Sequence, residues 1–284
     1  MELETIAIFR SPFATKFGIP RQSGLVPGLR GRIVFAPAFR DSAALRGIEG
    51  YDYLWLIWGF SGGWKLQGKG LGDSGRARKN EGIARESEGM ARENEGVMRE
   101  SEGVARVRDG GGMRDGMRGG EKGVMFSPTV RPPVLGGNVR MGVWATRSPN
   151  RPNPIGLSSV KIESVEWDTP EGPVIHVLGG DLMDGTPIYD IKPYVTYSDA
   201  HPDARSGFAE AHKGERLQVV VPEEMRRVFG EEDLATLKEI LACDPRPRYH
   251  DDGERVYGMD FMGHDVKFSI RDGVVRCTMA SDDG

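Results

Sequence analysis

The stretch from residue 142 to 158, which reads GVWATRSPNRPNPIGLS, combines cationic side chains with three prolines. Each proline removes a backbone hydrogen-bond donor and fixes φ, so the composition is typical of neither a regular helix nor a central strand. We therefore expect a stiff loop that holds Arg147 and Arg151 in place. A guanidinium held at low entropic cost suits recognition of a carboxylate, a phosphate or a nucleotide. The alternative interpretation is a rigid turn with solvated arginines.

Three other polar clusters fall in segments that we expect to be loops at strand ends. They are 20–22 (PRQ), 131–138 (RPPVLGGN) and 181–194 (DLMDGTPIYDIKPY). The last of them holds three carboxylates, Asp181, Asp184 and Asp190. A positioned carboxylate accepts a proton in general base catalysis, which makes all three candidate bases. Aspartate before glycine also commonly caps a turn, and that structural role stays open for each of them.

Other familiar catalytic patterns are absent from the sequence. It has no GxSxG nucleophile motif, no Walker loop for phosphate and no closely spaced pair of cysteines for zinc. Its five histidines lack metal-ligand spacing, so we expect no metal site. The two cysteines, Cys243 and Cys277, fit reduced thiols, and a disulfide between them stays open.

The 284 residues have the composition of a soluble protein, with 38% hydrophobic and 28% charged residues. The formal net charge of -4 is not the basic footprint of many nucleic-acid-binding proteins, but a local patch can bind phosphate while acidic surface elsewhere sets the total. No stretch approaches the ~18 consecutive apolar residues of a membrane span, and the N-terminus does not resemble a secretory signal. We expect a cytoplasmic protein.

Hydrophobic patterning predicts the elements that must position these clusters. We expect strands at 3–9, 31–35, 53–60, 140–147, 155–167 and 173–179. The run at 53–60 is apolar on both faces and therefore typical of a buried central strand, whereas 158–167 alternates as a half-exposed strand does. Towards the C-terminus we expect a strand at 216–221, helices that begin after Pro222 and at Glu231, and strands at 256–262, 265–271 and 274–280.

These patterns divide the chain into three parts. Residues 1–61 and 126–205 are expected to form a mainly β domain, and 206–284 a small C-terminal α+β domain. Residues 62–125 interrupt the first domain, because from Glu81 a seven-residue unit repeats four times with one glycine in each copy. Each glycine costs roughly 1 kcal/mol of helix stability, so we interpret this segment as a low-complexity insertion, disordered or loosely helical.

Five motifs become recognisable when they are taken together. They are SPFxxKFxxPRQ (11–22), LRGIE (45–49), VRPPxLGGNxRxGVxATRSPxRPNPIGLS (130–158), DLxDGTPxxDIKPY (181–194) and DPRPxY (244–249). In this order they resemble the TrmO/TsaA-like family of S-adenosylmethionine-dependent tRNA methyltransferases, over residues 3–60 and 126–277. The resemblance implies a β-barrel core and a homodimer with the cofactor near the subunit boundary. It also implies methylation of N6 of threonylcarbamoyladenosine, which lies just 3′ of the anticodon in tRNA.

The resemblance further implies roles for individual residues. Positions that contact the cofactor in the family correspond here to Pro20, Arg21, Gln22, Arg147, Leu157, Asp184, Gly185, Thr186 and Pro187. The threonyl carboxylate of the implied substrate needs a cation, so Arg131, Arg151 and Lys192 are candidate substrate contacts, together with Asn153 and Tyr194. One departure is the pair Ser61-Gly62, because family members commonly carry a His-Gln pair there that approaches the cofactor.

Two alternatives remain open from the sequence. In one, the same scaffold methylates another nucleoside or a small amide, so that it binds S-adenosylmethionine without tRNA-dependent turnover. In the other, the chain is a non-catalytic binding module that binds a partner and no cofactor. The Ser61-Gly62 departure favours the second alternative.

Overall fold

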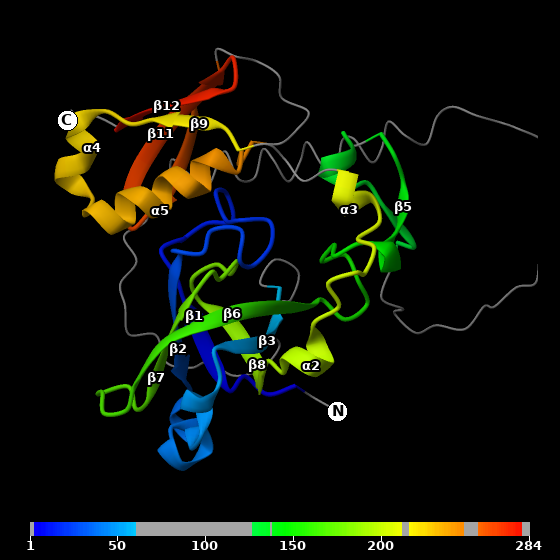
Figure 1. The fold of residues 1–284 in the computed structure, drawn as a ribbon, viewed down its shortest axis with the longest axis vertical. Helices are drawn as coiled ribbons and strands as arrows, with labels where there is room; N and C mark the ends of the chain where they lie inside the picture. The colour runs from blue at the N-terminus through cyan, green and yellow to red at the C-terminus, as the bar shows by residue number, and fades with distance from the viewer. Residues whose placement is uncertain (1–2, 61–126, 137, 212–215, 247–254, 280–284) are drawn as a thin grey trace, which may run out of the picture. The chain divides into compact units, whose positions relative to one another are not determined.

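The computed structural model describes residues 3–60, 127–136, 138–211, 216–246 and 255–279 (Figure 1). The expected insertion at 62–125, the Ser61-Gly62 pair and the end of the DPRPxY motif lie outside these residues. Most of the described secondary structure is β, which confirms the prediction of a mainly β fold. The domain boundaries stay predictions.

Six antiparallel strands pair in a closed circuit, which we call the closed sheet. Its strands are β1 (Ala7–Arg10), β2 (Arg30–Phe35), β3 (Tyr53–Gly59), β6 (Ile155–Glu166), β7 (Val174–Leu178) and β8 (Thr186–Pro193). They follow the order β1-β2-β7-β6-β3-β8, and β8 pairs again with β1 (Figure 1). In this register the start of β2, the start of β6 and the end of β7 lie at the same end of the closed sheet. The segments that precede β2 and β6 and the segment that follows β7 therefore lie at that end.

The interior of the closed sheet is apolar because alternate residues of each strand point inwards. Leu54, Leu56 and Trp58 of β3 are buried, whereas Tyr53 and Trp55 point outwards and remain at least partly exposed. β3 lies between β6 and β8, which confirms the prediction of a central strand. The expectation that both of its faces are buried is wrong, because a closed sheet buries only the inner face of each strand within itself.

The C-terminal part combines two helices with a second sheet. Its elements are β9 (Gln218–Val220), α4 (Glu223–Val228), α5 (Glu231–Ala242), β10 (Tyr257–Phe261), β11 (His264–Arg271) and β12 (Val274–Met279). The strands follow the order β10-β11-β12-β9, with β9 parallel to β12 and the other pairs antiparallel. Every element predicted for this part is therefore present, with each end within two residues of its predicted position.

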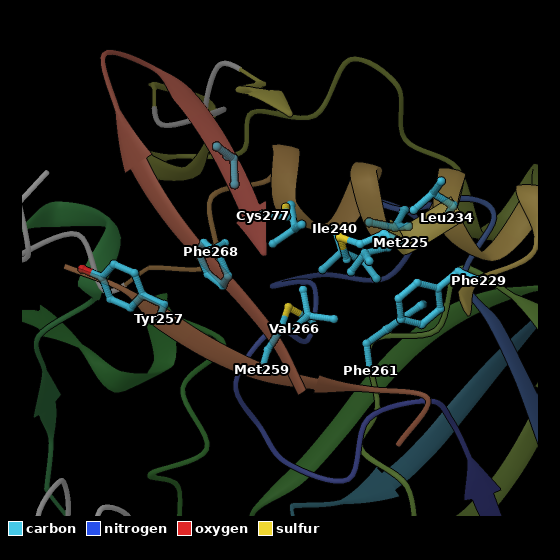
Figure 2. Close-up of a cluster of buried hydrophobic side chains, with 14 of the residues drawn as sticks. Met225, Phe229, Leu234, Ile240, Tyr257, Met259, Phe261, Val266, Phe268 and Cys277 are labelled. Atoms are coloured by element: carbon cyan, nitrogen blue, oxygen red, sulfur yellow. The ribbon is translucent and has the colours of Figure 1, made fainter. Parts of the chain in front are cut away.

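Amphipathic spacing explains how α5 forms and packs. Its first turn carries three acidic residues, which suit the positive end of the helix dipole. Leu234, Leu237 and Leu241 recur at helical spacing and are buried. Figure 2 shows this helix face packed with aromatic and aliphatic side chains of the second sheet, among them Phe261 and Phe268. We call this cluster the C-terminal core.

Shorter elements complete the described chain. β4 (Thr129–Val130) and β5 (Met141–Gly142) form a two-stranded pair, and α2 (Thr196–Asp199) and α3 (Phe208–Ala211) are single turns of helix. Within the described ranges, no helix has the length and apolarity needed to cross a membrane. Cys243 and Cys277 are both free thiols.

Two expectations about loops and strands were wrong. The segment 181–194 is not a loop throughout, because β8 runs through it despite Pro187 and Pro193. Pro187 faces Ile8 of β1 and has no register partner on β3, and Pro193 ends the strand, so both prolines occupy positions that strands tolerate. Conversely, the strand expected at 140–147 is only two residues long and continues as a 3-10 turn.

The proline-rich stretch at 142–158 is a loop only as far as Pro154, which agrees with the strand predicted at 155–167. Its last residues, from Ile155, form the start of β6, which lies between β7 and β3 and is therefore a central strand. The last proline, Pro154, lies just outside that strand, where its missing N–H costs no ladder bond.

Candidate active site

The turn after β7 brings the PRQ segment against the closed sheet. Gly179 has a φ of +78°, in the left-handed region that favours glycine, and a Cβ there would lie 3.4 Å from the backbone of Gly24. Gly24 N–H donates to Gly179 O, and Gly179 N–H donates to Leu29 O, both at 2.8 Å. This close approach places the backbone of Ser23, the residue after the PRQ segment, beside Asp181, which follows shortly after the turn.

Asp181 is the centre of a hydrogen-bond network at this end of the closed sheet. Trp58 Nε1–H donates to Ser158 Oγ at 3.0 Å, and the Ser158 hydroxyl donates to Asp181 Oδ1. Ser158 is 1% exposed, so both of its hydrogen bonds replace bonds to water. The carboxylate also accepts from the backbone N–H of Ser23. The network holds the carboxylate in one orientation through groups from β3, β6 and the residue that follows the PRQ segment.

Burial raises the pKa of Asp181 above its ordinary value of 3.8. Hydrogen bonds from Ser158 and from the backbone N–H groups of Asp181 and Ser23 act in the opposite direction, as does the positive charge of Arg147. Because desolvation outweighs these contributions, the carboxylate holds a proton more tightly than an exposed aspartate does. A raised pKa in a polar cluster is a property of groups that accept protons in catalysis.

Arg147 reaches the same cluster from the proline-stiffened loop. Its Nη1 donates to Gln22 Oε1, which joins two segments that are distant in the sequence. Arg147 is itself exposed, so its other guanidinium N–H groups face solvent or a ligand. The arrangement offers a cation and a side-chain amide next to a desolvated carboxylate.

Arg151 stabilises the loop from within. Its Nη1 donates to Val143 O at 3.2 Å and to Thr146 O at 2.6 Å, and its guanidinium lies over the ring of Trp144, 5.2 Å from the centroid. Thr146 Oγ1 also donates to Val143 O at 2.8 Å. These bonds agree with the predicted stiffness of the loop. The guanidinium of Arg151 is bound to the loop's own backbone.

Asp184 lies at a different place from Asp181. Its carboxylate accepts from Ser11 N–H at 3.1 Å and from Arg10 Nη1 at 3.3 Å. The turn that follows is tight, with Gly185 at a φ of +78° and Thr186 Oγ1 donating to Met183 O at 2.7 Å. Asp184 lines a cavity of about 480 Å³ between β1, β2 and α5, and neither Gln22 nor Arg147 borders it. The geometry of Asp184 is that of a turn cap.

The third candidate base and two substrate candidates lie on or just after β8. Asp190 Oδ2 is 2.8 Å from Lys192 Nζ, and Asp190 Oδ1 accepts from Ile191 N–H. The ring of Tyr194 lies 5.6 Å from that of Trp55 and 6.1 Å from that of Tyr53. These residues line the outside of the closed sheet, away from its buried interior.

The remaining predicted residues are spread over several surfaces. Pro20 is buried, whereas Arg21 is exposed and donates to the carbonyl oxygens of Asp244 and Arg246, which links the PRQ segment to the DPRP motif. Leu157 is 55% exposed and neighbours Ser158 on β6. The last two candidate substrate residues, Arg131 and Asn153, are exposed.

Sequence reasoning missed Ser158, Ser23 and Trp58 as members of the network. A signal for Ser158 was present, because Gly156, Ser158 and Val160 share one face of a predicted strand, and a serine on an inward face needs a partner. Ser23 contributes only its backbone N–H to the network, and a residue's type does not indicate where its backbone donates.

Two family models match the chain. The tRNA-methyltransferase O N-terminal domain matches residues 8–77 and 117–200, and the TrmO C-terminal domain matches residues 214–281. Together they account for all the segments that carry the motifs quoted above.

Individual proteins are similar over the same range. A tRNA (adenine(37)-N6)-methyltransferase of Escherichia coli K12 is 30% identical over 289 residues, covering 95% of this chain and 94% of that protein. One of Eikenella corrodens with the same name is 44% identical over 156 residues, covering 55% of this chain and 87% of that protein. The crystal structure of TrmO from Pseudomonas aeruginosa superposes with a TM-score of 0.61 at 26% identity, covering 98% of this chain and 96% of that one.

Proposed function

The chain belongs to the tRNA-methyltransferase O family, and from that premise we propose that it methylates N6 of threonylcarbamoyladenosine 37 in tRNA with S-adenosylmethionine as donor. The observation that carries the proposal is the cluster of Gln22, Arg147 and Asp181. Three segments far apart in the sequence meet there, because Arg147 donates to Gln22 and its positive charge acts on Asp181, whose carboxylate accepts from Ser158 and from the backbone N–H of Ser23. Relatives named as enzymes of this activity, similar over nearly the whole chain, support the same reaction.

The proposal also covers the architecture of the core, the oligomeric state and the cellular location. The closed circuit of six strands supports a β-barrel core of the kind that the family resemblance implies. A homodimer with the cofactor near the subunit boundary fits the exposed positions of Leu157 and Arg147. A tRNA substrate supports a cytoplasmic location.

The residues of the cluster fit S-adenosylmethionine. Arg147 is exposed and already oriented by Gln22, which supports a role in binding the carboxylate of the cofactor's amino-acid end. Leu157 offers an apolar contact for the adenine ring, and buried Pro20 stiffens the adjoining segment. When bound, S-adenosylmethionine supplies a methyl group on a positively charged sulfur. The remaining positions, Arg21 and the turn at 184–187, are proposed to shape the site from outside the cluster.

Asp181 is the best supported of the three candidate bases. The N6 nitrogen of threonylcarbamoyladenosine is part of a urea-like group, so it is a poor nucleophile until its proton leaves. The raised pKa of Asp181 favours acceptance of that proton, and Ser158 and Ser23 hold the carboxylate in place. Asp184 and Asp190 already have cationic partners within 3.3 Å and 2.8 Å, respectively, which favours structural roles.

The substrate candidates also differ in whether their side chains are exposed or already bonded within the protein. Lys192 and Arg131 are exposed cations that suit the threonyl carboxylate and the tRNA backbone, and Tyr194 suits stacking against a base. Arg151 is proposed to act through the loop, because its guanidinium binds two backbone carbonyls there. Asn153 is proposed to contact substrate from the same loop.

A methylation assay tests the proposal. Purified protein and S-adenosylmethionine are incubated with tRNA that does or does not carry threonylcarbamoyladenosine, and the nucleosides are analysed by mass spectrometry. We expect a gain of one methyl group on threonylcarbamoyladenosine and none on the unmodified tRNA. Methylation of a different nucleoside would support the alternative substrate, and cofactor binding without any transfer would count against the reaction.

A further inference from the structure

The outer surface of β6, β3 and β8 carries aromatic and lysine side chains in adjacent positions. Tyr53 and Trp55 alternate with inward residues of β3 and therefore point outwards. Lys161 of β6 is the register partner of Tyr53, and Lys192 of β8 is the register partner of Trp55. With Tyr194 and Tyr189 these residues form what we call the aromatic face.

The rings of the aromatic face contact one another and are held in place. Tyr194 lies against both Trp55 and Tyr53, with ring centroids 5.6 Å and 6.1 Å apart. Trp55 Nε1–H donates to Asp199 Oδ2 at 2.8 Å, and the same oxygen accepts from Val195 N–H at 2.9 Å. Tyr53 is nevertheless 43% exposed. A surface aromatic cluster with fixed ring orientation is therefore present beside two lysines.

The aromatic face extends towards Leu157 because the ring of Tyr189 lies against Gly59. A Cβ at Gly59 would lie 2.3 Å from the hydroxyl oxygen and 2.8 Å from the ring of Tyr189, so glycine allows the tyrosine to lie across β3. The register of β8 shifts at this point, which places Tyr189 as an extra residue beside the strand. The aromatic face therefore runs along β3 from Tyr53 to the neighbourhood of Leu157, a span of about 13 Å at ~3.3 Å per residue.

We propose that the aromatic face binds the nucleotides that flank adenosine 37 of the tRNA, a role that rests on the proposed function. Bases stack on aromatic side chains irrespective of sequence, and cations beside them follow the phosphates. Lys161 and Lys192 supply that charge. Because the face ends near Leu157, nucleotides stacked on it lead to the site where the methyl donor is proposed to bind.

Charge favours RNA over a protein partner on this surface. Lysine is depleted in the centres of protein interfaces, whereas here two lysines are the register partners of the rings. The ion pair between Lys192 and Asp190 is exposed and contributes little stability, so Lys192 can turn to a phosphate at low cost.

A double variant, Tyr53→Ala with Tyr194→Ala, tests the proposal in the full chain. We expect its affinity for threonylcarbamoylated tRNA, measured by filter binding at fixed salt, to fall at least tenfold, because the variant removes two rings on which bases stack. Calorimetry should find its affinity for S-adenosylmethionine unchanged. The conservative variant Tyr53→Phe with Tyr194→Phe should bind tRNA like the wild type. Trp167→Ala, which removes an exposed ring beyond the end of β6, is the matched control and should have no effect.

Lys161→Gln tests the charge separately. It should weaken tRNA binding at low salt and reduce the slope of log affinity against log salt by about one, the signature of one lost phosphate contact. Undiminished tRNA binding by the double alanine variant would overturn the proposal. So would a change in its oligomeric state on sedimentation, which would assign the face to a second copy of the chain. If the wild type binds tRNA through these rings but transfers no methyl group, the proposed function fails while the aromatic face stands.

Discussion

The interiors of the closed sheet and of the C-terminal core are both apolar, but they treat polar groups differently. The two buried polar side chains among the described residues, Ser158 and Thr186, both belong to the closed sheet. The C-terminal core consists of aromatic, aliphatic and methionine side chains together with Cys277. The closed sheet thus buries hydrogen-bonded polar side chains, whereas the C-terminal core buries mainly apolar ones.

The cost of burying a hydroxyl explains why the difference matters. A buried polar group without a partner destabilises a protein by about 1–3 kcal/mol, so such groups persist only where hydrogen bonds satisfy them. Ser158 has two partners and orients Asp181, whereas Thr186 only closes a turn. We infer that the closed sheet carries the chemistry and that the C-terminal core supplies stability.

Asp181→Asn should produce the largest effect on activity. The amide keeps the size of the side chain but cannot accept a proton, so we expect single-turnover methylation to slow by about 10²–10⁴-fold. Asp190→Asn, on the outer side of β8, is the control and should stay within a few-fold of the wild type. Equal rates for wild type and Asp181→Asn would remove Asp181 as the base.

Leu237→Ala should have the largest effect on stability. Leu237 is fully buried in the C-terminal core, so the truncation should lower the free energy of unfolding by about 2–5 kcal/mol, as measured in urea. The rate of methylation per folded molecule should be unchanged at a temperature where the variant remains folded. A large loss of rate in the folded variant would show that the two regions are not separable in this way.

Ser158→Ala should shift the pH dependence of the reaction. The hydrogen bond from Ser158 lowers the pKa of Asp181, so its removal raises that pKa further. A base must be deprotonated to act, so the acidic limb of the kcat/KM profile should move to higher pH. At the pH of the wild-type acidic limb, kcat/KM of the variant should be about tenfold lower than that of the wild type. Ser159→Ala, the next residue on β6, should leave the profile in place. An unmoved limb in Ser158→Ala would mean that the network does not tune the base.

The smallest expected effect concerns the thiol of the C-terminal core. Burial raises the pKa of Cys277 to about 11, so almost none of it is thiolate at neutral pH. We expect Cys277 to react with iodoacetamide at pH 7.5 only as the protein unfolds, as peptide mapping would show. Rapid labelling in the native protein would indicate that this core opens more readily than its packing implies.

The sequence predicted the fold best where a strong local pattern decides the structure. The leucines of α5 and the alternation of β6 are such cases. It failed at β8, because proline and aspartate indicate a loop locally while pairing with β1 and β3 imposes a strand. The order of strands in the closed sheet depends on pairings between distant residues, which local patterning does not specify.

For the site, the sequence indicated which residue types carry the chemistry but not which of them meet. Gln22, Arg147 and Asp181 come together, whereas Asp184 and Asp190 find other partners. Nothing in the motifs distinguishes the three aspartates. Their surroundings do, because one carboxylate is desolvated and the other two are paired with exposed cations.

The central claim is that the Gln22, Arg147 and Asp181 cluster is the cofactor end of a methyltransferase site. Calorimetric titration of S-adenosylmethionine into the wild type, Arg147→Gln and Arg30→Gln tests it most directly. Arg30 is the matched control, because its guanidinium is also exposed but pairs with Glu163 and Glu232 away from the cluster. We predict that Arg147→Gln binds S-adenosylmethionine at least tenfold more weakly, as expected for one lost charge-assisted contact, and that Arg30→Gln binds like the wild type. Equal affinity of Arg147→Gln and the wild type would contradict the account.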